Sequence, residues 1–425
     1  MPVHAKPTVE KNNTIPCSPV RVLTLATHPI QYQAPLWRLL STQPGFELLA
    51  CFGTDMSVRG YKDREFGVSL AWDTPLLEGY DSVFLSKDPR IQQVNFSSPT
   101  ANGIRDHIIK FKPDVAVMTA YFSRFHLESW WTLRRMGIPL VMRHEASDVA
   151  HARKGWKAQL RDVMLRRFYA RIDQFAYIGL EARRHLTRLG VSDSRLTHSP
   201  YCVDSTFVGE QVGIWAECRA SLRLELGIGT NELALVFSGK LISKKNPLLI
   251  ARALVALNEA GHSDIVNRIH VIIAGDGELR VEAEAQFTHI LGNRAHFLGF
   301  LNQREMGRAY ASGDCLVLPS GKGTGETWGL VVNEAMQYGL PCMVSDGVGC
   351  HSDLIVEGET GWVFASNDFA GLALALRQWA ETSDSNRLRI RANVEAKVRS
   401  VSIEAAAEGL TIAIRRAANN AHLRK

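Results

Sequence analysis

The sequence predicts an α/β protein with two doubly wound parallel sheets. Short apolar runs suited to buried strands alternate with helical patterns in both halves of the 425 residues. That alternation is typical of parallel sheets. The periodicity breaks around residues 199–207, which indicates a linker between the two sheets. A chain of this length is also expected to divide into two or three domains.

Composition and charge exclude several classes of protein. With 46% hydrophobic and 22% charged residues, the chain has the composition of an ordinary soluble protein. No apolar run reaches the ~18–20 residues of a membrane span. The seven cysteines are scattered without a C-x-x-C pair, which argues against a zinc site and for a reducing, cytoplasmic compartment. The net charge of +6 is too small to indicate nucleic-acid binding.

The first half is expected to form one domain over residues 20–198, after a disordered lead-in over residues 1–19 that lacks an apolar core. Strands are predicted over residues 20–27, 46–52, 115–118 and 139–143. Helices are predicted from Pro35 onward, over 102–111 and over 127–136. Residues 53–93 are irregular, with several prolines and aromatic residues, and predict a long functional loop region.

Residues 151–190 read as helical and strongly basic. Ten lysines and arginines stand there against three acidic residues. Most such runs are solvated helix faces. The alternative is a docking face for an anionic membrane surface or a lipid-phosphate acceptor, which would make the protein peripheral on the inner face of a membrane.

The second half is expected to form another domain over residues 199–402. Strands are predicted over residues 233–238, 269–274, 295–297, 315–318 and 341–345. Helices are predicted over 248–260, 279–291, 303–312 and 369–382, and the alanine-rich residues 403–422 predict a final helix. Two such sheets form a cleft, and ligands of α/β sheets bind at the carboxyl ends of the strands.

The glycine-rich loop over residues 319–329 is the most informative stretch. It follows a predicted strand and leads into a helical pattern that begins near Trp328. This arrangement places backbone N–H groups and a positive dipole end at an anion. Glu326 lies where the loop meets the helix, and Glu334 lies eight residues further on. Because carboxylates accept hydrogen bonds from sugar and ribose diols, the stretch fits a nucleotide-sugar.

Two further strand ends carry phosphate-binding chemistry. Residues 239–245, G-K-L-I-S-K-K, follow the strand over 233–238, and residues 275–280, G-D-G-E-L-R, follow the strand over 269–274. Gly275 and Gly277 permit close backbone approach there, and Glu278 begins a helix. Each feature alone is weak evidence for phosphate binding, but three such strand ends in one sheet indicate that they share one binding site.

These motifs resemble those of the family 4 retaining glycosyltransferases of the GT-B fold. The resemblance covers nearly all of residues 196–365 and includes the E-x(7)-E signature formed by Glu326 and Glu334. It rests on F-S-G-K-L-I-S-K-K-N-P, I-I-A-G-D-G-E-L-R, H-F-L-G-F-L-N-Q-R-E-M, L-P-S-G-K-G-T-G-E-T-W-G-L-V-V-N-E-A-M and G-L-P-C-M-V-S-D-G-V-G. The first half matches mainly in its alternation and in P-L-V-M-R-H-E at residues 139–145. The resemblance implies a first Rossmann-like domain that binds the acceptor and a second one that binds the nucleotide-sugar donor. Residues 403–425 would form a helix that packs back on the first domain.

The resemblance implies a catalytic set of four residues. Lys240 and Lys245 would grip the donor diphosphate, although the family usually has arginine at the first position. Glu326 would hold hydroxyls of the donor sugar, and His144 would contact that sugar near the reacting carbon.

It also implies a set of donor-binding residues. Glu334 would hold the two ribose hydroxyls, and backbone amides near the start of the helix would meet the diphosphate. The implied set is Gly239, Gly275, Asp276, Gly277, Glu278, Thr327, Trp328, Gly329, Leu330 and Glu334. Glycine-turn structure explains Asp276 nearly as well as a nucleoside contact does.

The first half departs from the resemblance after its first strand. Relatives commonly carry a double-glycine loop there, whereas this chain has T-H-P-I-Q-Y-Q. His28 and Gln31 are therefore candidates for acceptor contact. The alternative for His28 is that it merely caps a turn.

The implied reaction is the transfer, with retention, of a hexose-type sugar from a UDP- or GDP-linked donor to a hydroxyl acceptor. A saccharide, a lipid-linked saccharide or a small molecule would serve as acceptor in polysaccharide, lipopolysaccharide or glycolipid biosynthesis. No D-x-D motif follows a strand, so metal independence and no cofactor are expected. The alternatives are a GT-B-fold epimerase or hydrolase acting on the nucleotide-sugar, and a non-catalytic nucleotide-binding scaffold that docks on membranes.

Overall fold

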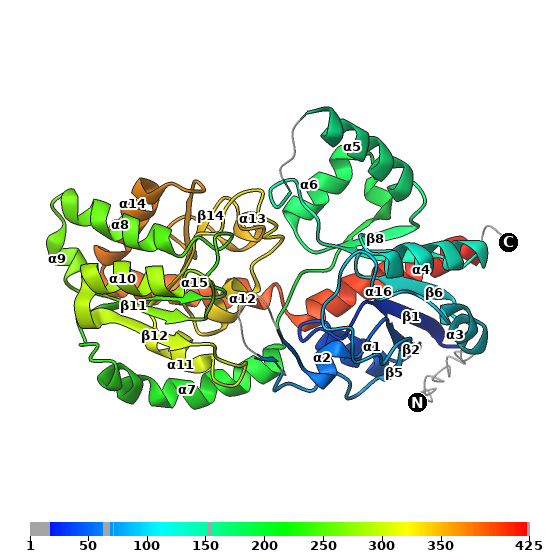
Figure 1. The fold of residues 1–425 in the computed structure, drawn as a ribbon, viewed down its shortest axis with the longest axis horizontal. Helices are drawn as coiled ribbons and strands as arrows, with labels where there is room; N and C mark the ends of the chain where they lie inside the picture. The colour runs from blue at the N-terminus through cyan, green and yellow to red at the C-terminus, as the bar shows by residue number, and fades with distance from the viewer. Residues whose placement is uncertain (1–17, 63–68, 71, 152–154, 423–425) are drawn as a thin grey trace, which may run out of the picture.

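Two parallel sheets form the cores of the two halves of the molecule, as the computed structural model in Figure 1 shows. The structure describes residues 18–62, 69–70, 72–151 and 155–422. Most of the lead-in expected over residues 1–19 therefore lies outside the described residues, as do Arg153 and Lys154 of the basic stretch.

The first sheet has the strand order β5-β2-β1-β6-β7-β8-β9, and every neighbouring pair is parallel. Its strands are β1 (Val20–Ala26), β2 (Phe46–Phe52), β5 (Asp81–Phe84), β6 (Val115–Met118), β7 (Leu140–His144), β8 (Gln174–Tyr177) and β9 (Leu196–His198). The helices of this half are α1 (Ala34–Thr42), α2 (Met56–Arg59), α3 (Ile104–Phe111), α4 (Arg124–Arg135), α5 (Trp156–Tyr169), α6 (Leu180–Arg188) and the 3-10 helix η1 (Asp193–Arg195). A small antiparallel pair joins β3 (Tyr61–Lys62) to β4 (Ser69–Leu70).

The second sheet has the order β12-β11-β10-β13-β14-β15 and is also parallel. Its strands are β10 (Leu233–Ser238), β11 (Ile269–Ala274), β12 (Ala295–Gly299), β13 (Cys315–Leu318), β14 (Cys342–Ser345) and β15 (Gly361–Phe364). The helices are α7 (Ser205–Glu225), α8 (Leu248–Glu259), α9 (Ser263–Val266), α10 (Arg280–Leu291), η2 (Gly292–Arg294), α11 (Gly307–Ser312), α12 (Leu330–Gln337), α13 (His351–Leu354), α14 (Phe369–Ala380) and α15 (Asp384–Arg399). The strands β10, β11, β13 and β14 are buried along their whole length, which explains their continuous apolar sequences.

Several elements were not predicted, among them α15, and between residues 151 and 207 the structure also differs from the elements that were predicted. The stretch 151–190 is not continuously helical, because β8 lies between α5 and α6. The expected linker over 199–207 is extended only as far as Asp204. The carboxylate of Asp204 accepts a hydrogen bond of 3.1 Å from the Phe207 amide and so caps α7. A short apolar run such as β8 cannot be told from a buried helix segment by periodicity.

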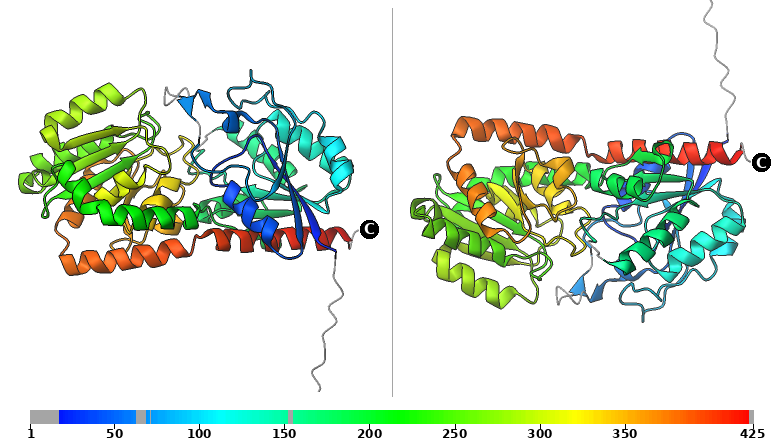
Figure 2. Two further views of the ribbon diagram at one scale, coloured as in Figure 1. Left: turned by 90° about the horizontal axis from the view of Figure 1, so that it is seen from below. Right: turned by 90° about the horizontal axis from the view of Figure 1, so that it is seen from above.

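The last helix, α16 (Ile403–His422), returns to the first sheet after α15 has followed the second (Figure 2). Its inward face is buried against the first core and consists of Ile403, Ala406, Ala407, Leu410, Ala413, Ile414 and Ala417. Gly409 lies so close to the sheet that a Cβ there would be 1.8 Å from the carbonyl oxygen of His198. Small side chains therefore let this helix pack directly on β8 and β9.

In the described part of the chain, none of the helices combines the length and the apolar character that crossing a bilayer requires.

Candidate functional site

The three predicted strand ends meet at one edge of the second sheet. β11, β10 and β13 are neighbours in the sheet, so the segments that follow them emerge together. These segments are residues 239–245, 275–280 and 319–329. The sheet order thus brings together the lysines, the glycines and Glu326 as the sequence predicts.

Gly275 and Gly277 are required by contact between two of these loops. A Cβ on Gly275 would lie 1.9 Å from the carbonyl oxygen of Gly239, and its φ of +150° disfavours other residues. The amide of Leu241 donates to the carbonyl of Asp276 at 2.9 Å. The close backbone approach that these glycines permit is therefore between the loops after β10 and β11, and no ligand is needed to explain it. Asp276 itself accepts a hydrogen bond from the Gly277 amide at 2.8 Å, which is the turn that the sequence left as its alternative role.

Lys245 and Glu326 form a largely buried ion pair. The ammonium nitrogen of Lys245 lies 2.6 Å from Oε2 of Glu326, with side-chain exposures of 16% and 9%. The Ser320 hydroxyl donates to the same oxygen at 3.1 Å. Burial acts to raise the pKa of Glu326, but Lys245, Lys244 and Ser320 outweigh it, and the pKa lies below its usual value. Glu326 is therefore ionised at neutral pH and ready to accept hydrogen bonds.

Glu334 has the opposite electrostatic environment. The Tyr310 hydroxyl donates to its Oε2 at 2.7 Å, and Gln303 also bonds the carboxyl group. Burial nevertheless raises the pKa of Glu334 above its usual value. The two glutamates of the E-x(7)-E pair thus stand in one site with carboxyl groups of different acidity.

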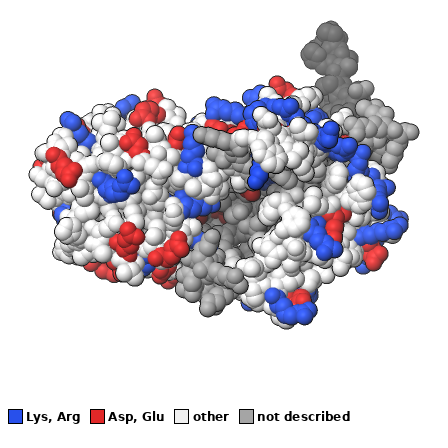
Figure 3. Space-filling model, turned by 45° about the horizontal axis from the view of Figure 1, so that its top comes forward, with Lys and Arg blue, Asp and Glu red and all other residues white. Residues whose placement is uncertain are grey.

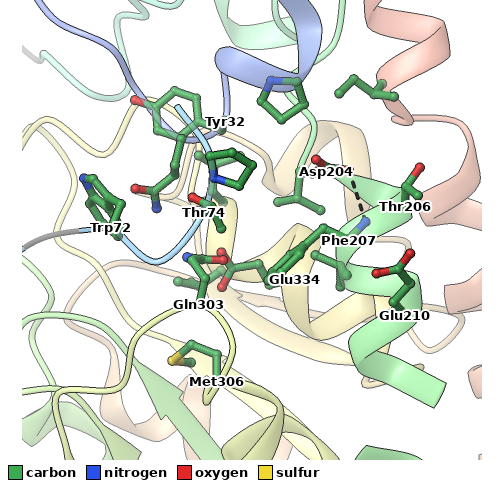
Figure 4. A pocket seen from close by; sticks show the side chains of 18 of the residues that line it. Tyr32, Trp72, Thr74, Asp204, Thr206, Phe207, Glu210, Gln303, Met306 and Glu334 are labelled. Atoms are coloured by element: carbon green, nitrogen blue, oxygen red, sulfur yellow. Dashed lines mark hydrogen bonds between the residues drawn. The ribbon is translucent and has the colours of Figure 1, made fainter. Parts of the chain in front are cut away.

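A cavity of about 660 Å³ lies between the two halves of the molecule (Figure 4). Its walls include Tyr32 and Trp72 from the first half and Gln303, Met306 and Glu334 from the second. This volume is in the range of small-molecule sites, roughly 300–1,000 Å³. Glu334 faces into the space, which is otherwise lined mainly by apolar and aromatic side chains. Such a cavity can hold a planar ring system beside a polar diol.

Several predicted residues line this cavity and others do not. Those that line it are Gln31, Gly239, Gly275, Leu330 and Glu334. Lys240 is partly buried at the end of β10, and Glu278 is exposed. Thr327 is partly buried, and its carbonyl oxygen lies close to Gly349.

Trp328 and Gly329 serve the contact between the two halves and the turn into α12. Trp328 is 3% exposed, and its indole donates to Asn333 at 2.7 Å. The ring packs so closely on Gly179 of the first half that a Cβ there would be 2.3 Å from it. Gly329 has φ +104° immediately before α12, a conformation that favours glycine.

The structure does not bring His144 to the cavity. Its side chain is 2% exposed, with its ring stacked between those of Tyr121 and His185. Burial first, and His185 second, lower the pKa of His144 to about 3. A neutral ring enclosed by aromatic side chains has no access to a sugar in this conformation.

His28 also lies away from the cavity walls. Its Nδ1 is 3.0 Å from the Thr27 hydroxyl, and burial lowers its pKa to about 4. This contact is with a neighbouring side chain and does not test the turn-capping alternative, whereas Gln31 lines the cavity.

Sequence reasoning missed several polar groups around the site. Gln303 and Tyr310 hold Glu334, and Tyr201 donates to Glu145 at 2.7 Å across the end of the first sheet. Gln303 and Glu145 lie inside motifs that the resemblance rests on, but those motifs assign them no role, and Tyr201 and Tyr310 lie outside the motifs. Tyr32, which also lines the cavity, could have been proposed from the sequence, because it follows Gln31 in the stretch T-H-P-I-Q-Y-Q.

Comparisons with known proteins agree with this architecture. Residues 219–397 match the family model described as glycosyl transferases group 1. The chain is similar to the sulfoquinovosyl transferase SQD2 of Arabidopsis thaliana, with 36% identity over 37% of this chain and 28% of that protein. It is also similar to the D-inositol 3-phosphate glycosyltransferase of Nocardia farcinica, with 28% identity over 61% of this chain and 57% of that protein. The chain thus spans less than two thirds of the length of these relatives.

Solved structures share the fold. Anabaena Alr3699/HepE in complex with UDP-glucose superposes with a TM-score of 0.66 at 15% identity, covering 93% of this chain and 99% of that one. WaaG, a glycosyltransferase involved in lipopolysaccharide biosynthesis, superposes with a TM-score of 0.57 at 19% identity, covering 91% and 98%. The chain therefore has the GT-B fold, and its residues 219–397 are similar to the glycosyl transferases group 1 family.

Proposed function

We propose that the protein is a retaining, family 4 type glycosyltransferase that moves a hexose-type sugar from a UDP- or GDP-linked donor to a hydroxyl acceptor. The observation that carries this proposal is the buried Lys245–Glu326 pair, whose lysine lies next to Gly239 and acts electrostatically on Glu334, two residues that line the interdomain cavity. Relatives named as glycosyltransferases and a structural neighbour in complex with UDP-glucose support it.

The proposed chemistry follows from charge development in the transition state. As the bond between the anomeric carbon and the diphosphate breaks, negative charge grows on the leaving phosphate. Lys240, Lys245 and the N-terminus of α12 would stabilise that charge with groups that are already in place. Lys245 would keep its contact with Glu326, whose ionised carboxylate would accept hydrogen bonds from the sugar.

Retention of configuration rests on the resemblance to the family. The acceptor would attack on the side from which the nucleotide leaves, with a phosphate oxygen taking the acceptor proton. His144 is left out of the catalytic set, because its ring is enclosed in the first core. Metal independence remains part of the proposal, since protein cations would supply the charge that Mg²⁺ supplies in other transferases.

Two alternatives compete with transfer. A GT-B-fold epimerase or hydrolase would change or cleave the nucleotide-sugar without an acceptor, and it needs acid and base groups from the first half. A non-catalytic scaffold would bind the nucleotide and release nothing. The desolvated, oppositely perturbed Glu326 and Glu334 favour catalysis, because such pKa shifts cluster at functional sites.

Labelled UDP- and GDP-sugars, supplied with and without EDTA and with mixed saccharide and lipid acceptors, separate these functions. We expect nucleotide release that rises with acceptor, is unchanged by EDTA and leaves labelled product in the acceptor. Epimerised or free sugar formed equally well without acceptor would contradict transfer. Tight binding without turnover would indicate the scaffold.

We also propose that the protein is cytoplasmic and docks on an anionic membrane through α5. Trp156, Leu160 and Met164 point outward on this helix with exposures of 69%, 54% and 64%. Lys157 and Arg167 lie beside them and are exposed, and Figure 3 shows Lys and Arg side chains on the same face of the molecule. Outward apolar groups flanked by cations match the chemistry of an anionic bilayer. A lipid-linked acceptor would be available at such a surface.

A further inference from the structure

A polar cluster stands at the carboxyl end of the central part of the first sheet. Residues of a strand alternate between its two faces, so Arg143 and Glu145 point to one side and His144 to the other. Arg143 and Glu145 both contact Tyr201: the guanidinium lies 5.4 Å from the centre of the ring, and the carboxylate accepts the hydroxyl hydrogen bond at 2.7 Å. Tyr32, which lines the interdomain cavity, meets the Tyr201 ring edge-to-face at 5.2 Å.

Hydrogen bonds from Arg143 to backbone carbonyl groups fix the position of this cluster. Arg143 is 4% exposed and donates to the carbonyl oxygens of Ser199 at 3.2 Å and Pro200 at 3.0 Å. This anchors the segment that carries Tyr201, whose hydroxyl then fixes one carboxylate oxygen of Glu145. Among the residues that the structure describes, no hydrogen bond is found to the other oxygen of Glu145. Glu145 is therefore positioned while part of its hydrogen-bonding capacity is free for a ligand.

The segment that follows Glu145 contacts the glycine-rich loop of the second half. The amides of Gly323 and Gly325 donate to the carbonyls of Val149 and Ala150 at 2.8 and 2.7 Å. Lys244, whose ammonium group donates to the Gly325 carbonyl at 3.0 Å, is close enough to act on the carboxylate of Glu145. Glu145 is not one of the cavity-lining residues, but it lies within electrostatic reach of Lys244, beside the contact that holds the loop bearing Glu326.

Burial raises the pKa of Glu145, and the opposing influence of Tyr201, Arg143 and Lys244 does not cancel it. A carboxyl group that only needed to satisfy Tyr201 could be replaced by any neutral acceptor at lower desolvation cost. Keeping an acid there is costly for the fold, which is the pattern of a functional group.

We propose that Glu145 is a sugar-binding residue contributed by the first domain. Its carboxylate accepts hydrogen bonds from hydroxyls of the transferred sugar, on the side opposite Glu326, so that the sugar is held by one acid from each half. This inference rests on the proposed function and adds a group that determines which sugar is bound. The residue acts on the glycosyl part of the donor and not on its nucleotide.

The test compares affinities for the nucleotide and for the nucleotide-sugar. Calorimetric titrations with UDP, UDP-glucose, GDP and GDP-mannose identify which pair the wild-type protein binds. In Glu145→Gln, we expect about a tenfold loss of affinity for the sugar-linked ligand, because a charge-assisted hydrogen bond becomes a neutral one, and no change for the free nucleotide. Glu47→Gln, at the opposite end of the first sheet with its side chain 50% exposed, is the matched control.

Equal affinities in Glu145→Gln and wild type, or equal losses for nucleotide and nucleotide-sugar, would overturn the assignment. If the wild-type protein binds none of the four ligands, the proposed function itself fails, which is a distinct result. Tyr201→Phe keeps the acid but releases it, and should lower affinity for the sugar-linked ligand selectively and by a smaller factor. A loss for the free nucleotide in that variant would also contradict the role.

Discussion

At the scale of single residues, the site depends on charges removed from water. Lys245 and Glu326 are both largely buried, and a buried ion pair is weak evidence for stability because its desolvation offsets its attraction. Retaining the pair makes sense if its members are needed by a ligand. In the proposed reaction, Lys245 meets the leaving phosphate and Glu326 meets the sugar.

Removing either charge should reduce turnover and also lower folding stability, because the other member of the buried pair is left without its partner. For Lys245→Ala and Glu326→Gln, we expect kcat to fall by about 10²–10³, since each removes a preorganised electrostatic contact. Lys322→Ala is the control in the same loop, because that lysine is half exposed and bonds Asp346 at 3.1 Å. Nucleotide release from a donor sugar, measured beside the melting temperature, checks this. Full activity in either variant would contradict the assigned roles.

The raised pKa of Glu334 predicts a pH-dependent stability. Its proton is bound more tightly in the folded than in the unfolded state, so its contribution to stability is complete below the unfolded pKa. That contribution is lost as pH rises through the folded pKa. Glu334→Gln removes this titration and keeps an oxygen for the Tyr310 hydroxyl. We expect the variant to melt higher than wild type at pH 8, with the difference shrinking toward pH 4.

The same substitution should weaken ligand binding at pH 8 by about tenfold or more, because a carboxylate accepts the ribose hydrogen bonds more strongly than an amide does. Melting curves at several pH values, with and without nucleotide, measure both effects. A variant that is less stable than wild type at pH 8, or that binds nucleotide equally well, would show that Glu334 has a structural role only.

The positions of residues could be predicted from the sequence where the site is local, but not where they depend on strand orientation; the roles of these residues remain predictions. Lys245, Glu326 and Glu334 lie in loops and helix starts whose spacing is readable, and the sheet order brings them to one edge. His144 and Glu145 differ by one position at the end of a strand. Successive residues of a strand point to opposite faces of the sheet. Which of the two points toward the cleft depends on how neighbouring elements pack on those faces, and the sequence of the strand does not give this.

At the scale of elements, the loops after β10 and β11 support each other. Gly275→Ala would place a methyl group 1.9 Å from the Gly239 carbonyl oxygen at φ +150°. Backbone strain alone costs about 1–3 kcal/mol, and the clash adds to it. We expect a clearly lower free energy of unfolding and loss of nucleotide binding together. Gly213→Ala, in α7 with open space around it, should instead be neutral or slightly stabilising. The free energy of unfolding of both variants can be measured by urea denaturation. A Gly275→Ala variant as stable as the wild-type protein would contradict the close approach of the two loops.

The outward face of α5 makes a prediction about membranes. The wild-type protein should co-sediment with phosphatidylglycerol-containing vesicles more strongly than with pure phosphatidylcholine, and added salt should weaken the binding. Changing Trp156 and Met164 together to Ser should lower binding at least about tenfold, since each buried apolar side chain contributes about 1.5–3 kcal/mol. Leu388→Ser, 70% exposed on α15, is the matched control. Equal binding to neutral vesicles, or an unchanged double variant, would count against α5 as the docking face.

Prediction of elements from sequence was best for the fully buried strands. β10, β11 and β13 were predicted with their observed bounds because continuous apolar runs have few other uses. The unpredicted β5, β9 and β15 are edge strands, and β5 is only partly buried. An edge strand is short and less apolar, and its pairing comes from the neighbour and not from its own pattern.

At the scale of the whole molecule, the two halves contact each other directly. Trp328 packs on Gly179, and the Leu180 amide donates to both oxygens of Asp353 at 3.0 Å. Only α7 with its preceding segment and the junction of α15 and α16 carry the chain between the sheets (Figure 2), as far as the described residues show. Such a connection suits domain closure on a ligand, which would exclude water from the reacting bond.

The most direct measurement is the melting temperature of the wild-type and Lys245→Ala proteins in the presence of UDP, GDP and their sugar derivatives. A ligand at 100 times its Kd stabilises the folded state by about 2.7 kcal/mol. We predict that one nucleotide series raises the melting temperature of the wild-type protein, and that the variant loses most of this shift at the same concentration. No shift with any ligand, or the same shift in both proteins, would contradict a nucleotide-sugar site at this sheet edge.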